Sequence, residues 1–236
     1  MTFNDSSRTV SVETEPYCWF RRVGMAALAV AVFLACHLAA LGLVGETRWN
    51  LLWLLGTQGI TGAILLLLAI LQYRRQGGFK ALLGHDPERA LRLGAPLIIV
   101  AYLVVTFIEA ALGHTQGTFR GPALSDFSAV QIMLFFAMLL VFPAITEELL
   151  YRHFLIRLFP LNGRTWQTLA VIVTTLLFMQ AQGQYQHWPS YLLMGGLGVI
   201  LGVARIVSGG LAAPILLHAL ADATGMTSDL FLTSLD

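Results

Sequence analysis

Apolar segments of bilayer-spanning length constrain this chain more than any other feature. They cover residues 23–45, 49–73, 94–113, 166–183, 189–207 and 210–225, and a further segment begins near 129 and runs through Glu147. A membrane helix needs about 20 predominantly apolar residues. Only 11% of the 236 residues are charged, against about 25% in soluble domains. The sequence therefore predicts an all-α polytopic transmembrane bundle of about seven to eight helices.

Lys and Arg gather at one set of helix ends. They precede the first segment as Arg21 and Arg22, and they fill the connections between segments two and three and between four and five, whereas the opposite loops carry only Arg48 and Arg120. Cytoplasmic loops are enriched in these residues, so we expect an integral membrane protein with a cytoplasmic N-terminus. The net charge of +1 disfavours nucleic acid as a partner.

The fourth segment carries charges where charge is costly in a bilayer. The stretch TEELLYRHF, 146–154, follows the apolar run without a turn signal, and ionisable residues at such depth usually mark function. On a helix, Glu148 and Arg152 lie on one face, so we expect Arg152 to neutralise Glu148. Glu147 points about 100° away and can face a cavity as a general base. A charge cluster at the lipid headgroups is the alternative.

The fifth and last segments supply further polar side chains. In LLHALAD, 216–222, His218 and Asp222 lie four residues apart in an otherwise apolar helix. Gln182 ends the stretch FMQAQ, 178–182, and its amide can donate and accept hydrogen bonds but cannot carry a proton. We expect these side chains to line one polar pocket with Glu147. The alternative for His218 and Asp222 is a hydrogen-bonded pair that only holds helices together.

Such a pocket predicts hydrolysis of a peptide or amide bond inside the membrane. Glu147 would take a proton from water, and His218 with Asp222, or a backbone N–H, would stabilise an oxyanion. These three residues are permissible zinc ligands, but only one of them is a nitrogen ligand and the sequence has no His-Glu-x-x-His motif. We therefore expect no metal or other cofactor. A transporter is disfavoured because no inverted repeat is evident.

The ordered set of motifs resembles the CAAX protease and bacteriocin-processing family, also called CPBP or Abi. EELLYR, 147–152, matches its Glu-Glu-x-x-x-Arg motif, and HALAD, 218–222, matches its His-x-x-x-Asn/Asp motif. The glycine-rich stretch 195–222 resembles the helix pair of the family. The chain departs from the family in its middle motif, Phe-x-x-x-His, where Phe178 is in place but Gln182 replaces the histidine.

The resemblance implies a glutamate-dependent intramembrane endopeptidase, similar to CAAX prenyl protease 2, acting on a membrane-associated protein or peptide in the bacterial inner membrane. It implies a structural role for Glu148 and Arg152, and it places at the catalytic positions Glu147, Gln182, His218 and Asp222. Some members have lost catalytic residues. Gln182 therefore leaves open an alternative, a catalytically impaired scaffold or regulator that binds partner helices.

Four parts of the chain are expected on these grounds. A cytoplasmic arm covers 1–22, and variable transmembrane helices cover 23–128. A CPBP-like core follows at 129–225, with the catalytic cavity among its four helices, and a tail covers 226–236.

Overall fold

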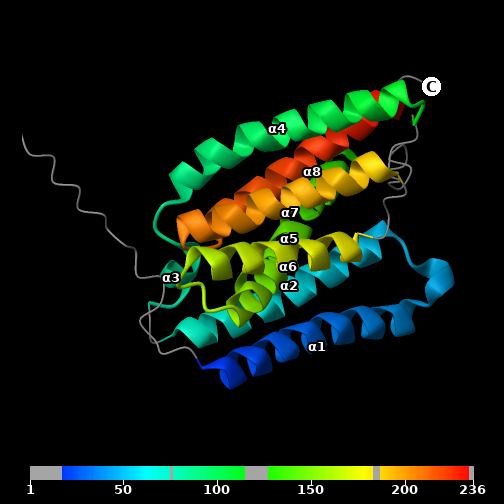
Figure 1. Ribbon diagram of the computed structural model, residues 1–236. Helices are drawn as coiled ribbons and strands as arrows, with labels where there is room; N and C mark the ends of the chain where they lie inside the picture. Colours follow the sequence, from blue (N-terminus) through cyan, green and yellow to red (C-terminus); the bar gives the residue numbers. More distant parts are fainter. Residues whose placement is uncertain (1–17, 75–76, 115–126, 183–186, 234–236) are drawn as a thin grey trace, which may run out of the picture.

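The chain folds into a bundle of long helices lying side by side, as the computed structural model shows (Figure 1). The structure describes residues 18–74, 77–114, 127–182 and 187–233, and it contains no strand within them. Most of the predicted cytoplasmic arm, 1–17, lies outside the described residues. The helices are α1 (Trp19–Val44), η1 (Glu46–Arg48), α2 (Leu51–Tyr73), α3 (Phe79–Leu83), α4 (Pro87–Ala111), α5 (Ala129–Glu147), η3 (Glu148–Leu155), η4 (Ile156–Leu158), α6 (Arg164–Ala181), α7 (Trp188–Ser208) and α8 (Ala212–Thr233). The prediction of an all-α bundle is confirmed.

Five helical segments in the described part of the chain are long and apolar enough to cross a membrane. They are Trp19–Val44, Leu51–Tyr73, Phe79–Ala111, Ala129–Leu158 and Trp188–Ser208. Many large apolar side chains on these helices are exposed, including Leu38 and Phe107, each 67% exposed. Such surfaces are stable in hydrocarbon and not in water. The chain is an integral membrane protein, and the structure places α6 and α8 inside the same bundle.

Two helix boundaries differ from the predicted ones. Helix α4 begins at Pro87, not near 94, because Asp86 caps it by accepting a hydrogen bond from the Arg89 N–H and Pro87 tolerates the first turn. The expected surface element between 72 and 94 is therefore α3 and the start of α4. Helix α8 does not end at Gly225 but continues to Thr233.

Gly225 is a contact residue and not a helix stop. A Cβ at this position would lie 3.1 Å from the ring of Tyr102 on α4. The missing side chain lets the two helices approach closely, as small residues do in membrane bundles. The tail predicted for 226–236 is consequently helical through 233, and 234–236 lie outside the described residues.

Helices from both sides of residue 128 pack together. Helix α4 lies against α7 and α8, and α2 lies against α5. A Cβ on Gly62 of α2 would come within 2.6 Å of Thr146 Oγ1, and the Thr146 hydroxyl donates to the Gln58 carbonyl over 2.7 Å. Thr146 directly precedes Glu147, so α2 fixes the backbone next to the candidate base. The domain boundaries themselves stay a prediction.

The helix that carries the two glutamates changes its geometry at this point. Residues Glu148–Leu155 form a π-helix, η3, that continues α5. The side chains from Glu148 to Phe154 are all buried, so this segment is surrounded by protein on every side. Short π-helical segments often occur at functional sites.

Candidate active site

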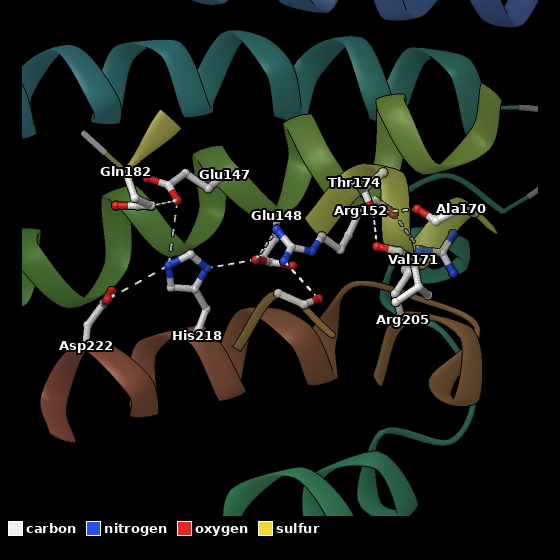
Figure 2. Close-up of polar contacts among 11 residues, drawn as sticks. Glu147, Glu148, Arg152, Ala170, Val171, Thr174, Gln182, Arg205, His218 and Asp222 are labelled. Carbon is white, nitrogen blue, oxygen red and sulfur yellow. Dashed lines mark hydrogen bonds and ion pairs between the residues drawn. The ribbon is translucent and has the colours of Figure 1, made fainter. Parts of the chain in front are cut away.

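Glu147 lies at the C-terminal end of α5, with its carboxylate directed toward Gln182 and His218 (Figure 2). The Nε2 group of Gln182 donates to Glu147 Oε2 over 3.3 Å. The same oxygen lies 3.9 Å from Nε2 of His218, and the Glu147 side chain is 16% exposed. The candidate base is thus partly accessible, with one amide donor and one imidazole facing it.

His218 is the centre of the site, because three carboxylates face its ring (Figure 2). Its Nδ1 lies 2.8 Å from Glu148 Oε1. Its Nε2 faces Glu147 on one side and lies 3.8 Å from Asp222 Oδ1 on the other. The edge-on ring of Phe178, with centroids 6.0 Å apart, packs against the imidazole. The ring is therefore oriented by Glu148 and held by packing.

Glu148 and Arg152 form the predicted contact. Arg152 NH1 lies 3.4 Å from Glu148 Oε1, and both side chains are completely buried. The guanidinium also donates to the Gly198 carbonyl through NH2 and lies 4.8 Å from the centroid of the Phe178 ring. The Arg205 Nε–H donates to the Arg152 carbonyl over 2.8 Å, which ties α7 to the same segment. The alternative of a charge cluster at the headgroups is excluded by this burial.

Gln182 is the first residue after α6, which ends at Ala181. It is half-buried and faces Glu147. This is the position expected if Gln182 replaces the histidine of the middle motif. Phe178, one turn earlier, is buried beneath His218 and Arg152. The four predicted residues Glu147, Gln182, His218 and Asp222 therefore converge, although their chemical roles stay predictions.

A cavity of about 410 Å³ joins these four residues. It is wider than predicted, because its wall includes α2 and α4 as well as the last four long helices. Leu51 and Gln58 of α2, Tyr102 and Glu109 of α4, and Leu232 of α8 all line it. Leu51 begins α2 and Leu232 lies near the end of α8, so the cavity extends from the buried histidine to one end of the bundle.

Sequence reasoning missed two polar features of the site. One is the Glu148–His218 contact, which joins different helices and so has no signature in local spacing. The other is Glu109 near the end of α4, which accepts a hydrogen bond from the Ser190 hydroxyl of α7. An acidic residue inside an apolar run is itself a signal of function, and this signal was available for Glu109.

The described side chains at the site offer few nitrogen ligands to a metal ion. No group of three or more His, Cys, Asp or Glu residues among them has an arrangement that could hold a metal ion. The cavity set contributes a single nitrogen ligand, His218, and its Nδ1 is already engaged by Glu148. The residues instead suit proton transfer by Glu147 and hydrogen bonding by His218 and Gln182.

These features define a class, a polytopic helical membrane protein with a carboxylate and histidine site between its helices. Residues 129–224 match the model of a protein family described as Type II CAAX prenyl endopeptidase Rce1-like. The family resemblance predicted from the motifs is confirmed over this part of the chain.

The chain is also similar to a curated protein of unassigned function. An uncharacterized 24.3 kDa protein of Escherichia coli is 30% identical over 138 residues, which cover 57% of this chain and 64% of that protein. The match thus spans less than two thirds of the relative. No solved structure matches the chain significantly.

Proposed function

We propose that this protein is an intramembrane endopeptidase that hydrolyses a peptide bond of a membrane-associated protein with a water molecule activated by Glu147. The observation that supports this most directly is the position of the Glu147 carboxylate, at a cavity wall between Gln182 and His218. The family model matched by residues 129–224 is described as a type II CAAX prenyl endopeptidase, a description that names the same class of reaction. No cofactor is required by the proposed chemistry.

The reaction begins with proton transfer from water to Glu147. The resulting hydroxide attacks the carbonyl carbon of the scissile bond and forms a tetrahedral oxyanion. Glu147 then returns the proton to the amide nitrogen, the C–N bond breaks, and a carboxylic acid and an amine are released. Gln182 holds the carboxylate through its Nε2–H donor but cannot share the proton.

His218 is proposed to stabilise the oxyanion. Its Nε2 lies 3.9 Å from Glu147 and 3.8 Å from Asp222, and separations of this size leave room for a bridging water or a substrate oxygen. With hydrogens on both ring nitrogens, Nδ1 donates to Glu148 and Nε2 donates to the oxyanion. Glu148 and Asp222 are positioning residues in this scheme, because they orient the ring and balance its charge.

The glutamine at the middle motif favours a second function, that of a scaffold which binds partner helices without cleaving them. The test is Gln182→His, with Gln167→His near the start of α6 as the matched control. A positioned acid–base partner contributes about 10²–10⁴-fold to rate, so we expect Gln182→His to accelerate cleavage about 100-fold or more. Mass spectrometry of a membrane-peptide library incubated with protein in liposomes measures this.

Two results would change the assignment. Cleavage by Gln182→His with none by the parent protein would favour the scaffold. An equal rate for the parent protein, Gln182→His and Gln167→His would show that position 182 does not contact the reacting atoms.

We further propose that the protein resides in a bacterial inner membrane with its N-terminus in the cytoplasm. Basic residues gather at the helix ends near Arg21, Arg74 and Arg164, as is typical of cytoplasmic ends. Arg48 and the cavity-lining residues Leu51 and Leu232 lie at the opposite helix ends. The cavity would then open toward the non-cytoplasmic side.

Native cysteines provide a direct test of this orientation. Cys18 is exposed before α1, and Cys36 is half-buried within α1. In a Cys36→Ala background, Cys18 should react with a membrane-impermeant maleimide only after spheroplasts are disrupted. The control protein carries Cys18→Ala, Cys36→Ala and Glu46→Cys, so that its thiol lies on the exposed helix η1. This thiol should react with the same maleimide in intact spheroplasts. The reverse pattern would invert the topology.

A further inference from the structure

Helix α7 contacts Arg152 at two places. The Arg205 Nε–H donates to the Arg152 backbone carbonyl over 2.8 Å, and Arg152 NH2 donates to the Gly198 carbonyl over 3.4 Å. Gly198 and Arg205 lie about two turns apart in α7, so the same face of this helix makes both contacts. Arg205 is only 4% exposed, and Arg152 is completely buried. The backbone and the side chain of Arg152 are therefore both held from α7.

The segment that carries Arg152 has an unusual backbone. Glu148–Leu155 forms the π-helix η3, a geometry that is rare and occurs mostly as single turns. Because a π-helix has a wider turn than an α-helix, the position of Arg152 does not follow from a regular continuation of α5. The last carbonyls of a helix also lack partners within it, and Arg152 lies in the last turn of η3. The hydrogen bond from Arg205 fixes this carbonyl from outside the segment.

A chain of contacts leads from Arg152 to the imidazole of His218 (Figure 2). Arg152 NH1 lies 3.4 Å from Glu148 Oε1, and His218 Nδ1 lies 2.8 Å from the same oxygen. The guanidinium and the imidazole thus share one carboxylate oxygen. All three side chains are buried, and close-packed interiors transmit a displacement instead of absorbing it. The orientation of the His218 ring therefore depends on where Arg152 is held.

We propose that Arg205 is a positioning residue for the hydrolysis, which fixes the His218 ring through Arg152 and Glu148 without touching the substrate. The inference rests on the proposed function only in taking the oxyanion as the ligand of His218 Nε2. Arg205 is not among the described residues that line the cavity, so its effect is on the direction of the Nε2–H. Hydrogen bonds weaken steeply as they depart from linearity.

Two neutral substitutions of similar length separate the hydrogen bond of Arg205 from its charge. Arg205→Gln places an amide nitrogen at the position that Nε has in arginine, so it keeps a donor for the Arg152 carbonyl. Arg205→Met offers no donor. The control is Arg22→Met, because Arg22 NH1 donates over 3.0 Å to the Arg157 carbonyl in η4. This control removes an arginine–carbonyl hydrogen bond outside η3.

Arg205→Met should lower kcat for peptide cleavage by about 100-fold, as small misplacements of reacting groups do. Peptide affinity, measured by fluorescence anisotropy in nanodiscs, should stay within about twofold of the parent, because the loss is confined to the transition state. Arg205→Gln and Arg22→Met should keep most of the parent kcat. Solid-state NMR of the His218 Nδ1–H group, assigned with His218→Gln, reports the contact with Glu148. Its signal should shift in Arg205→Met and match the parent in the other two proteins.

A parent-like kcat with an unshifted His218 signal in Arg205→Met would overturn the inference. Equal losses of kcat in Arg205→Met and Arg22→Met would do the same, because Arg205 would then only stabilise the fold. If Arg205→Met does not fold, Arg205→Gln decides, since a shifted His218 signal despite the retained donor contradicts the proposed chain of contacts.

The outcome for Arg205 is separable from the outcome for the proposed function. If the parent protein cleaves no peptide, the peptidase assignment fails. The NMR comparison of Arg205→Met with Arg205→Gln does not require cleavage, so it still tests whether Arg205 orients His218.

Discussion

Glu147→Gln should reduce the rate of peptide cleavage by about 10²–10⁴-fold, the usual contribution of a positioned general base. Glutamine keeps the size and one acceptor oxygen of the side chain, but it cannot take a proton from water. Its oxygen can still accept from Gln182, which now lies 3.3 Å from the carboxylate. The loss should therefore appear in kcat, with little change in peptide affinity.

The measurement is a time course of product formation in liposomes, using a peptide that the parent protein cleaves. Glu88→Gln is the control, because the substitution is identical but the residue is exposed and outside the cavity. Parent-like kcat in Glu147→Gln would remove Glu147 from the mechanism. A fall in affinity at unchanged kcat would instead make it a binding residue.

Arg152→Met should destabilise the protein by about 3–5 kcal/mol, the cost of leaving one partner of a buried ion pair uncompensated. Glu148 would remain fully buried with its Oε2 unpartnered, and only His218 would contact its other oxygen. The substitution also removes the cation from the face of the Phe178 ring. Reversible unfolding in detergent, followed by intrinsic fluorescence, measures the change.

A second substitution separates the charge effect from packing. Glu148→Gln combined with Arg152→Met removes both charges, and replacing a buried pair by neutral groups is often close to neutral in stability. The double variant should therefore be more stable than Arg152→Met alone. If Arg152→Met unfolds within about 0.5 kcal/mol of the parent, the range of ordinary surface substitutions, the pair is not a structural element.

The sequence predicted the features that depend on local spacing and hydropathy. Long apolar runs identified the membrane helices, and the four-residue spacing of Glu148 and Arg152 identified their contact, now seen at 3.4 Å. The angular separation of neighbouring helix residues correctly placed Glu147 toward the cavity and Glu148 in the interior. Each of these inferences needs only one helix at a time.

Features that depend on how helices meet were not predictable in the same way. The Glu148–His218 bond joins residues 70 positions apart. The π-helical geometry of Glu148–Leu155 has no simple sequence signal. The last apolar segment was predicted to end near 225, whereas α8 continues to Thr233 and Gly225 packs against Tyr102 of α4. Local sequence does not reveal this contact, because it depends on which helix packs against the glycine.

The cavity wall combines residues from inside and from outside the segment that matches the endopeptidase family. The segment that matches the endopeptidase family, 129–224, carries Glu147 and His218. Gln58 and Glu109, by contrast, come from helices outside that match. If the proposed function holds, mutations in α2 and α4 alter which peptides are accepted while Glu147 and His218 stay unchanged. Under the proposed function, this arrangement lets substrate preference diverge during evolution while the reaction chemistry stays constant.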